Sequence, residues 1–288
     1  MASLRQVIQQ THQALESSGI PDARLEAEVM VMNLMRLLRH DIYTNQEAEV
    51  GLQQEQELAG IVDRRLQREP LAYILGYREF YGINLMVTPD VLIPRPETEA
   101  LVEQALFMAL MGMETRDLVI ADVGTGCGAI AINLAIHLPH ARIFALDITD
   151  GALDVASYNV RAHNVADRVT LGKGDLLEPL EEPVDLIVAN LPYIPTDRIA
   201  SLQPEIQWEP GQALDGGPQG LDLITRLLAQ APAKLKEQGI ILLELDPEQA
   251  LVVENLARHH FPEATISLEQ DLAHQDRVLV VSRGGDSY

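Results

Sequence analysis

Hydrophobic and polar positions divide the chain into two parts with different periods. In residues 1–72 the apolar side chains recur at helical spacing, which predicts a bundle of three helices. Ser3 and Gln6 can form a capping box for the first helix, the second apolar run extends to Leu38, and residues 44–47 can cap the third. This part carries no obvious chemistry, so a structural cap and a recognition domain for a macromolecule are equally good interpretations.

From Asp117 onward, short apolar runs alternate with helical patterns, which predicts an α/β fold with a parallel sheet. Gly239 is expected to end the third of the helices in this part, and the last two strands are expected to form a closing antiparallel pair. The expected strands are residues 118–122, 142–147, 169–171, 184–188, 240–245, 265–268 and 277–281, and the expected helices are residues 129–138, 152–163, 221–235 and 248–259.

A linker joins the two parts. Alternating positions within residues 73–93 predict a β-hairpin, so that the expected catalytic domain covers residues 94–288. Two prolines flank Arg95 and make a stiff turn, after which Glu97 or Thr98 can start a helix. On pattern alone, this turn is better interpreted as ordinary surface than as the wall of a pocket.

Composition narrows the possible functions. The chain has 288 residues and a formal net charge of −22, which argues against a broad phosphate-binding surface because duplex binding relies on Lys and Arg. The single cysteine, Cys127, excludes an internal disulfide, so a reducing cytoplasm is the expected compartment. No apolar run is long enough for a membrane span, the polar N-terminus differs from a signal peptide, and the histidines lack metal-binding spacing. We therefore expect neither membrane nor metal.

A glycine turn follows the first strand of the α/β part. Gly124, Gly126 and Gly128 give the spacing D-x-G-x-G-x-G, which suits a nucleoside with a carboxylate tail and no pyrophosphate. Asp147 and Asp175 follow the next two strands, where they can bind ribose hydroxyls and an adenine amino group. Together these features predict S-adenosylmethionine as the cofactor. The alternative is that the glycines only make a tight turn and the acids only cap helices. Cys127, at the start of the helix, is a candidate nucleophile, but it has no apparent catalytic partner and is better interpreted as the small residue that the turn needs.

The strand at residues 184–188 leads into a polar and aromatic turn, Asn190-Leu191-Pro192-Tyr193. An amide and an aromatic ring then project from the carboxyl end of a buried strand, the edge at which open α/β sheets bind ligands. The segment that follows is long and rich in Pro and Gly, which makes it a candidate lid or substrate wall.

Several motifs together resemble the HemK/PrmC-type protein-(glutamine N5) methyltransferases, which modify peptide-chain release factors. The resemblance covers nearly the whole chain and reverses the interpretation of the Arg95 turn as ordinary surface. Its motifs are PLAYILG at residues 70–76, LIPRPETE at 92–99, DVGTGCG at 122–128, WEP at 208–210 and ALDGG at 213–217.

The resemblance implies a class I S-adenosylmethionine-dependent methyltransferase with a seven-stranded, Rossmann-like sheet, preceded by a helical domain that helps to bind the release factor. The implied reaction is methyl transfer to N5 of the glutamine in the Gly-Gly-Gln motif of release factors. The implied catalytic residues are Asn190, Pro192 and Tyr193. The implied cofactor-binding residues are Gly124, Thr125, Gly126, Cys127, Gly128, Asp147, Asp175, Leu176 and Asn190. The implied substrate-binding residues are Asn190, Leu191, Pro192, Tyr193, Arg95 and Glu97.

The chain departs from the family pattern at four places. Leu191 stands where the family has a proline, and Leu176 where an aromatic residue is often found. Asp246-Pro247 replaces the glycine-containing pair that the family has after the strand ending near Glu244. His274-Gln275 stands where the family usually has a glycine after the Asp-Leu-Ala run.

The chemistry implied by the resemblance explains why a leucine is compatible with activity at position 191. An amide nitrogen is a poor nucleophile because its lone pair is delocalised into the carbonyl. The Asn190 side-chain oxygen and the backbone carbonyl of Leu191 would each accept one N–H of the substrate amide, while Tyr193 stacks on its plane. Leucine supplies the same carbonyl as proline, although proline also restrains its own φ.

Two alternatives stay open at this point. An adenine-N6 methyltransferase acting on DNA or RNA uses a similar turn, although the net charge of −22 argues against direct nucleic-acid binding. The second alternative is a non-catalytic cofactor-binding protein whose motif has drifted. The departures at Leu191, Leu176 and Asp246-Pro247 are the observations that support it.

Overall fold

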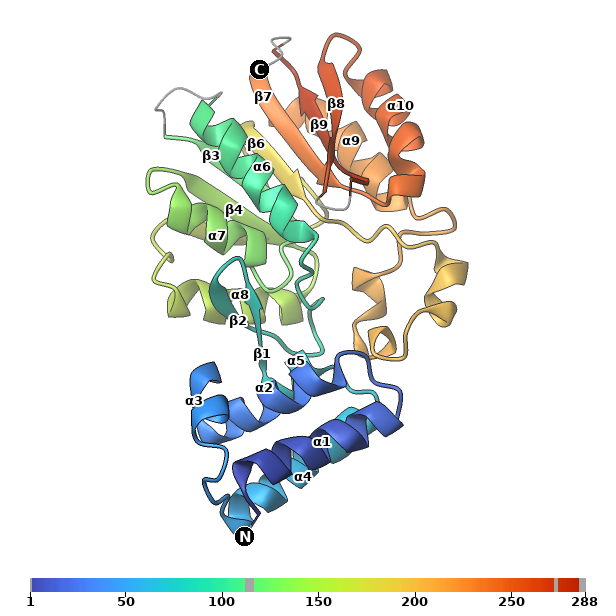
Figure 1. The fold of residues 1–288 in the computed structure, drawn as a ribbon. Helices are drawn as coiled ribbons and strands as arrows, with labels where there is room; N and C mark the ends of the chain where they lie inside the picture. Colours follow the sequence, from blue (N-terminus) through green and yellow to red (C-terminus); the bar gives the residue numbers. More distant parts are fainter. Residues whose placement is uncertain (1, 112–116, 272–273, 285–288) are drawn as a thin grey trace. The chain divides into compact units, whose positions relative to one another are not determined.

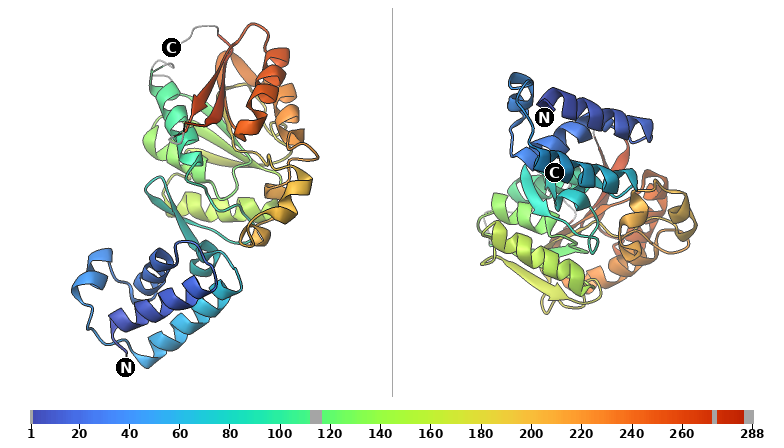
Figure 2. Two further views of the ribbon diagram at one scale, coloured as in Figure 1. Left: turned by 45° about the vertical axis from the view of Figure 1, so that its right-hand side comes forward. Right: turned by 90° about the horizontal axis from the view of Figure 1, so that it is seen from below.

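The computed structural model describes residues 2–111, 117–271 and 274–284. The chain divides into two compact units (Figures 1 and 2). The helical unit comprises Met1–Gly76 and Gln203–Trp208, and the sheet unit comprises Tyr77–Leu202 and Glu209–Tyr288. No helix in the described ranges is long and apolar enough to cross a membrane.

The helical unit is built around one apolar core. Its helices are α1 (Leu4–Ser17), α2 (Ala23–Met35), α3 (Arg39–Thr44), α4 (Leu52–Leu66) and α5 (Leu71–Leu75). The capping box predicted at the start of α1 is confirmed, with the Ser3 backbone N–H donating to Oε1 of Gln6 over 2.9 Å. Leu4, Leu15 and Met30 are fully buried in the shared core. The apolar residues that recur at helical spacing in the sequence are therefore the ones that this bundle buries.

The second helix is shorter than its apolar run suggested. α2 ends at Met35 because Arg36 has a φ of 54°, in the left-handed region that stops a helix. Leu38 therefore lies outside α2 and serves as the N-cap residue of α3.

The expected cap at residues 44–47 is wrong. Thr44 ends α3, and α4 begins only at Leu52. The residues between them run antiparallel to the N-terminus, where the N–H of Leu4 donates to the carbonyl of Ala48 over 2.8 Å. This long-range pairing holds the segment extended and delays the start of the helix.

The short segment Gln203–Trp208 belongs to the helical unit because of Glu205. The Arg65 guanidinium, 3% exposed, donates to Oε1 of Glu205 over 2.9 Å and to Oε2 of Glu26 over 2.6 Å. Arg68 donates to the other Glu205 oxygen over 3.1 Å. Arginine and backbone hydrogen bonds outweigh burial and hold the pKa of Glu205 below its usual range, so this carboxylate is ionised.

The sheet unit has the predicted α/β architecture. Its seven-stranded sheet has the order β5-β4-β3-β6-β7-β9-β8, in which only the pairings of β9 are antiparallel. The strands are β3 (Val119–Val123), β4 (Arg142–Asp147), β5 (Val169–Lys173), β6 (Val184–Ala189), β7 (Leu235–Glu244), β8 (Thr265–Gln270) and β9 (Asp276–Ser282). The predicted hairpin is also present, as β1 (Tyr77–Phe80) paired with β2 (Ile83–Met86).

Helices cover both faces of this sheet (Figure 1). One group, whose members pack side by side, is α6 (Thr98–Met111), α7 (Ala129–His137) and α8 (Asp150–Ala162). The other is α9 (Asp222–Lys234) with α10 (Ala250–His260). Alternate strand residues such as Ala121, Val123 and Ile187 are buried in the core that contains α9 and α10. The continuous apolar runs of the central strands follow from this two-sided burial.

Gly239 does not end a helix, contrary to expectation. α9 stops at Lys234, and β7 begins at Leu235 and contains Gly239. A Cβ atom at position 239 would lie 2.5 Å from the Leu235 side chain and 3.0 Å from the carbonyl oxygen of Asp185. The glycine therefore allows two chain segments to approach closely within an irregular part of the sheet.

Candidate active site

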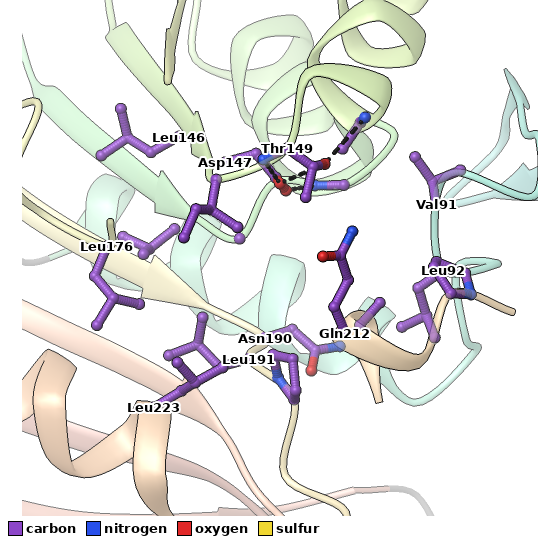
Figure 3. A pocket seen from close by; sticks show the side chains of 18 of the residues that line it. Val91, Leu92, Leu146, Asp147, Thr149, Leu176, Asn190, Leu191, Gln212 and Leu223 are labelled. Atoms are coloured by element: carbon purple, nitrogen blue, oxygen red, sulfur yellow. Dashed lines mark hydrogen bonds between the residues drawn. The ribbon is translucent and has the colours of Figure 1, made fainter. Parts of the chain in front are cut away.

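The carboxyl ends of the parallel strands border one pocket of the sheet unit. β3 lies between β4 and β6, so the chain reverses its direction of winding beside β3, and such switch points form ligand crevices. The pocket lining includes Gly124, Asp147, Leu176, Asn190 and the loop residue Gln212 (Figure 3).

The glycine turn needs all three of its glycines for backbone geometry. Gly124, Gly126 and Gly128 have φ values of 74°, 55° and 86°, which side-chain-bearing residues rarely adopt. The backbone N–H groups of Gly124 and Thr125 both donate to the carbonyl oxygen of Leu146, over 2.9 Å. These contacts fold the turn back onto β4, next to the strand end that carries Asp147.

A buried carboxyl group supports the turn from below. Oδ2 of Asp122 accepts hydrogen bonds from the Thr125 hydroxyl over 2.6 Å and from the Ala131 N–H over 3.1 Å. Burial raises the pKa of Asp122 to about 7. Burial likewise raises the pKa of the Cys127 thiol to about 12, so this thiol is protonated and cannot act as a thiolate nucleophile at neutral pH.

Asp147 connects the turn to the next helix. One oxygen accepts the N–H of Gly126 over 3.0 Å, and the other accepts the N–H and hydroxyl of Thr149, each over 3.0 Å. Its carboxylate is therefore held in one orientation at the edge of the pocket (Figure 3). A fixed carboxylate of this kind suits a ribose with two hydroxyl donors.

The far end of the pocket is apolar but contains one ion pair. Leu146, Leu176 and Leu223 line it (Figure 3), and Arg226 pairs with Asp175. The Asp175 carboxylate, predicted to face an adenine amino group, is thus already engaged by a guanidinium. Leu176 has a φ of 55°, an uncommon conformation for a residue with a side chain.

Asn190 is held in one amide orientation. Its Nδ2 donates to the hydroxyl oxygen of Thr98, at the start of α6, over 2.9 Å. With Nδ2 committed to Thr98, Oδ1 is the atom of this amide that is available to accept a hydrogen bond from a ligand. The residue is half-buried and lines the pocket (Figure 3).

Tyr193 reaches a buried carboxyl group beneath the turn. Its hydroxyl donates to Oε1 of Glu244, the last residue of β7, over 3.5 Å. Glu244 is 1% exposed, and burial raises its pKa to about 7. Burial and the Glu244 charge raise the pKa of Tyr193 as well, so the phenol is protonated.

The long loop packs against the backbone of the Asn190 turn. The Ile194 N–H donates to the carbonyl of Leu214 over 3.1 Å, and the Gly216 N–H donates to the carbonyl of Ile194 over 2.9 Å. A Cβ atom at Gly216 would lie 2.6 Å from the Pro192 carbonyl oxygen, and one at Gly220 would lie 2.1 Å from that of Tyr193. Glycine is required at both positions because backbone meets backbone there.

Gln249 fastens the same region from another direction. Its Nε2 donates to the carbonyl oxygens of Tyr193 over 2.9 Å, Gln219 over 3.1 Å and Gly220 over 3.2 Å. One buried amide thereby joins the turn to the end of the long loop.

Arg95 and Glu97 occupy different environments, and neither lines the pocket described above. Arg95 forms an ion pair with Glu209, whose side chain is 1% exposed and also accepts the Ile93 N–H over 3.1 Å. Glu97 is exposed. Arg95 therefore latches the loop segment containing Glu209 to the proline-flanked turn.

Leu191, one of the four departures from the family pattern, lies between the glycine turn and the Asn190 turn. Its side chain is 2% exposed, and a Cβ atom placed at Gly124 would lie 3.0 Å from its Cδ2. The leucine side chain thus packs against Gly124, the first glycine of the turn, and lines the pocket (Figure 3).

Sequence reasoning did not identify four residues of this region: Thr98, Gln212, Glu244 and Gln249. Thr98 was expected only to start a helix, and Glu244 only to lie in a strand. Thr98, Glu244 and Gln249 carry no local signal, because each acts through a partner remote in the chain. Glu244 is the exception, because an acidic residue is unusual at the end of a buried apolar strand and could have been noticed for that reason. Gln212 lies in the long segment that was expected to form a lid or substrate wall, and it lines the pocket.

This fold and pocket define the class of the protein, a class I S-adenosylmethionine-dependent methyltransferase. In agreement, residues 102–203 match the methyltransferase small domain and residues 6–76 the PrmC N-terminal domain. A solved methyltransferase from Pyrococcus furiosus has the same fold, with a TM-score of 0.51 and 15% identity over 71% of this chain and 91% of its own.

Similarity to curated proteins gives the family. The chain is 40% identical to a release factor glutamine methyltransferase of Moorella thermoacetica over 98% of this chain and 99% of that protein. It is 41% identical to one of Geobacter sulfurreducens over 87% of each. The chain belongs to the release factor glutamine methyltransferase family.

Proposed function

We propose that this protein transfers the methyl group of S-adenosylmethionine to N5 of the glutamine in the Gly-Gly-Gln motif of a peptide-chain release factor. The observation that carries the proposal is the fixed amide of Asn190, whose Nδ2 is engaged by Thr98 at the pocket with the glycine turn. Its Oδ1 is left to accept an N–H of a substrate amide. In this role the protein acts in the cytoplasm, contacts a protein substrate and needs no direct binding of nucleic acid.

The cofactor fits the residues present. The fixed carboxylate of Asp147 would bind the ribose hydroxyls, the leucine-lined end would hold the adenine, and the turn at Gly124–Gly128 would approach the carboxylate tail. The bound cofactor supplies an electrophilic methyl group on a sulfonium. Leu176 lines this side of the pocket, whereas Thr125 and Cys127 are buried within the glycine turn and would support it rather than touch the cofactor.

Positioning supplies most of the catalysis in this proposal. Asn190 Oδ1 and the Leu191 carbonyl accept the two N–H groups of the substrate amide, which favours a pyramidal nitrogen with its lone pair aimed at the methyl group. Pro192 stiffens the turn, and Tyr193 packs against the amide plane. Once methylated by the bound cofactor, the substrate nitrogen would release one proton to water while Asn190 and Leu191 keep the amide in place.

The remaining parts of the chain bind the larger substrate. We assign release-factor recognition to the helical domain, residues 1–72, joined by the linker 73–93 to the catalytic domain, residues 94–288. Arg95 and Glu97 border the substrate path, where Arg95 holds the loop through Glu209.

The test is transfer of labelled methyl groups to a purified release factor. A Gln→Ala variant of the Gly-Gly-Gln motif is the control, and DNA and RNA are incubated in parallel. Label on the wild-type factor and none on the variant is the expected result. Label on nucleic acid alone, or cofactor binding without any transfer, would overturn the proposal.

A further inference from the structure

The long loop places one polar side chain in the pocket that the reaction as proposed does not use. This residue is Gln212, the middle residue of the short helix η3 (Gly211–Ala213). Three residues of the loop line the pocket, Pro210, Gln212 and Ala213, and of these Gln212 alone has a polar side chain. The side chain points from the loop into the pocket, toward the side where Asp147 lies (Figure 3). Within the described ranges its amide has no hydrogen-bond partner, so its donor and its acceptor are both available to a ligand.

The backbone that carries Gln212 is held on both sides. On the N-terminal side, Glu209 forms its ion pair with Arg95, and the Glu209 side chain is 1% exposed. On the C-terminal side, the carbonyl of Leu214 accepts the N–H of Ile194 over 3.1 Å. The loop therefore presents the Gln212 amide from a fixed base, which suits a residue that contacts a ligand.

The proposed function places the ribose of S-adenosylmethionine at Asp147. Each ribose hydroxyl can donate one proton, and its oxygen can also accept hydrogen bonds. A carboxylate can only accept, so Asp147 takes the protons of the hydroxyls and leaves their oxygens in need of a donor. The primary amide of Gln212 supplies such a donor without adding a charge. Asp147 and Gln212 are therefore complementary in what they offer to a ribose.

We propose that Gln212 is a cofactor-binding residue whose Nε2 donates to a ribose hydroxyl that Asp147 also holds. The inference rests on the proposed placement of the ribose at Asp147. In this arrangement, the loop that packs against the Asn190 turn also contacts the cofactor. The loop thus joins the part of the pocket that binds the cofactor to the part that binds the substrate amide.

Calorimetry with S-adenosylhomocysteine, the demethylated cofactor, tests the contact without turnover. Gln212→Leu removes the donor and should raise the Kd about 3- to 10-fold. Gln212→Glu keeps the size of the side chain, but its carboxylate can only accept at neutral pH, so it should weaken binding at least as much. Gln203→Leu is the matched control and should bind as the wild-type protein does, since Gln203 is an exposed glutamine of the same loop. Wild-type affinity in Gln212→Leu or Gln212→Glu would overturn the proposal.

Analogues of S-adenosylhomocysteine that lack the 2′- or the 3′-hydroxyl identify the group that Gln212 holds. With the analogue that lacks the contacted hydroxyl, the effect of Gln212→Leu on the Kd should fall below about twofold, because the contact is already lost. Equal weakening of all three ligands by Gln212→Leu would overturn the proposal, since a general disturbance of the pocket gives that result.

Asp147→Asn, measured with the same ligands, tests the placement of the ribose separately. Its effect on the Kd should also shrink when a hydroxyl is missing. An effect of Asp147→Asn that is independent of both hydroxyls would overturn the placement of the ribose and this inference with it. A hydroxyl-dependent effect of Asp147→Asn beside a hydroxyl-independent effect of Gln212→Leu would overturn the role of Gln212 alone.

Discussion

The two sides of the pocket are built by contacts of different range. On the cofactor side, Gly124 and Gly126 lie on one short turn, and Asp147 follows on the next strand and accepts the Gly126 N–H. On the substrate side, the Asn190 turn is held by Thr98, 92 residues earlier, and by Gln249, 56 residues after Tyr193. The cofactor side is therefore visible in a local motif, whereas the substrate side depends on supports scattered through the chain.

The largest effect is expected at the amide of the substrate side. Asn190→Ala removes the acceptor that holds the substrate nitrogen, and we expect kcat to fall by about 10²–10³, by analogy with the loss of an oxyanion-hole donor. Cofactor affinity should change by less than about tenfold, since the glycine turn and Asp147 are intact. Single-turnover kinetics and calorimetry measure the two quantities. Turnover near the wild-type rate would contradict the mechanism.

The cofactor side should show the opposite division of effects. Asp147→Asn weakens charge-assisted hydrogen bonds to the ribose and to Gly126, so we expect the Kd for S-adenosylmethionine to rise about 10- to 100-fold. At saturating cofactor, most of the kcat should be recovered. Asp150→Asn is the control, because Asp150 is an exposed neighbour paired with Lys173. A loss of kcat without a change in Kd would show that the two sides are not separable in this way.

The same contrast explains how much of the structure could be predicted. Strands such as β4, and the hairpin, follow from periodicity because each buries a local pattern of side chains. The glycine turn and Asp147 follow from spacing. The ends of helices were harder, since the start of α4 depends on pairing with the N-terminus, and Gly239, expected to end α9, instead lies within β7, where it allows a close approach to Leu235 and Asp185.

The supports of the catalytic turn could not be predicted because their roles appear only in three dimensions. Glu244 and Gln249 are single polar residues in or beside buried apolar segments, and their partners lie on other elements. The ion pair of Arg95 with Glu209 joins two recognised motifs, yet their spacing does not reveal the contact. Recognition of the family identified the motifs, and the structure identifies what each motif holds.

The Gln249 clamp gives an intermediate test of the substrate side. Gln249→Leu leaves the carbonyls of Tyr193, Gln219 and Gly220 without their shared donor, which should lower the free energy of unfolding by about 1–3 kcal/mol. We expect kcat to fall about tenfold because the turn loses its link to the loop, with cofactor affinity little changed. Denaturant unfolding and steady-state kinetics are the measurements. Equal losses in kcat and cofactor affinity would show that the clamp supports the whole pocket rather than one side.

The smallest effect on kcat is expected from Leu191→Pro, at a residue that belongs to both sides. Its side chain packs over Gly124 on the cofactor side, while its carbonyl is proposed to hold the substrate amide. Leu191→Pro keeps that carbonyl and restores the family residue, so kcat should stay within about threefold of the wild-type value, a difference below 1 kcal/mol in activation free energy. Leu191→Ala also keeps the carbonyl but empties the buried space, and should reduce the free energy of unfolding by about 2–5 kcal/mol. A Leu191→Pro enzyme that lost activity as Asn190→Ala does would show that the packing of the leucine side chain, rather than the carbonyl alone, sets the geometry of the substrate side.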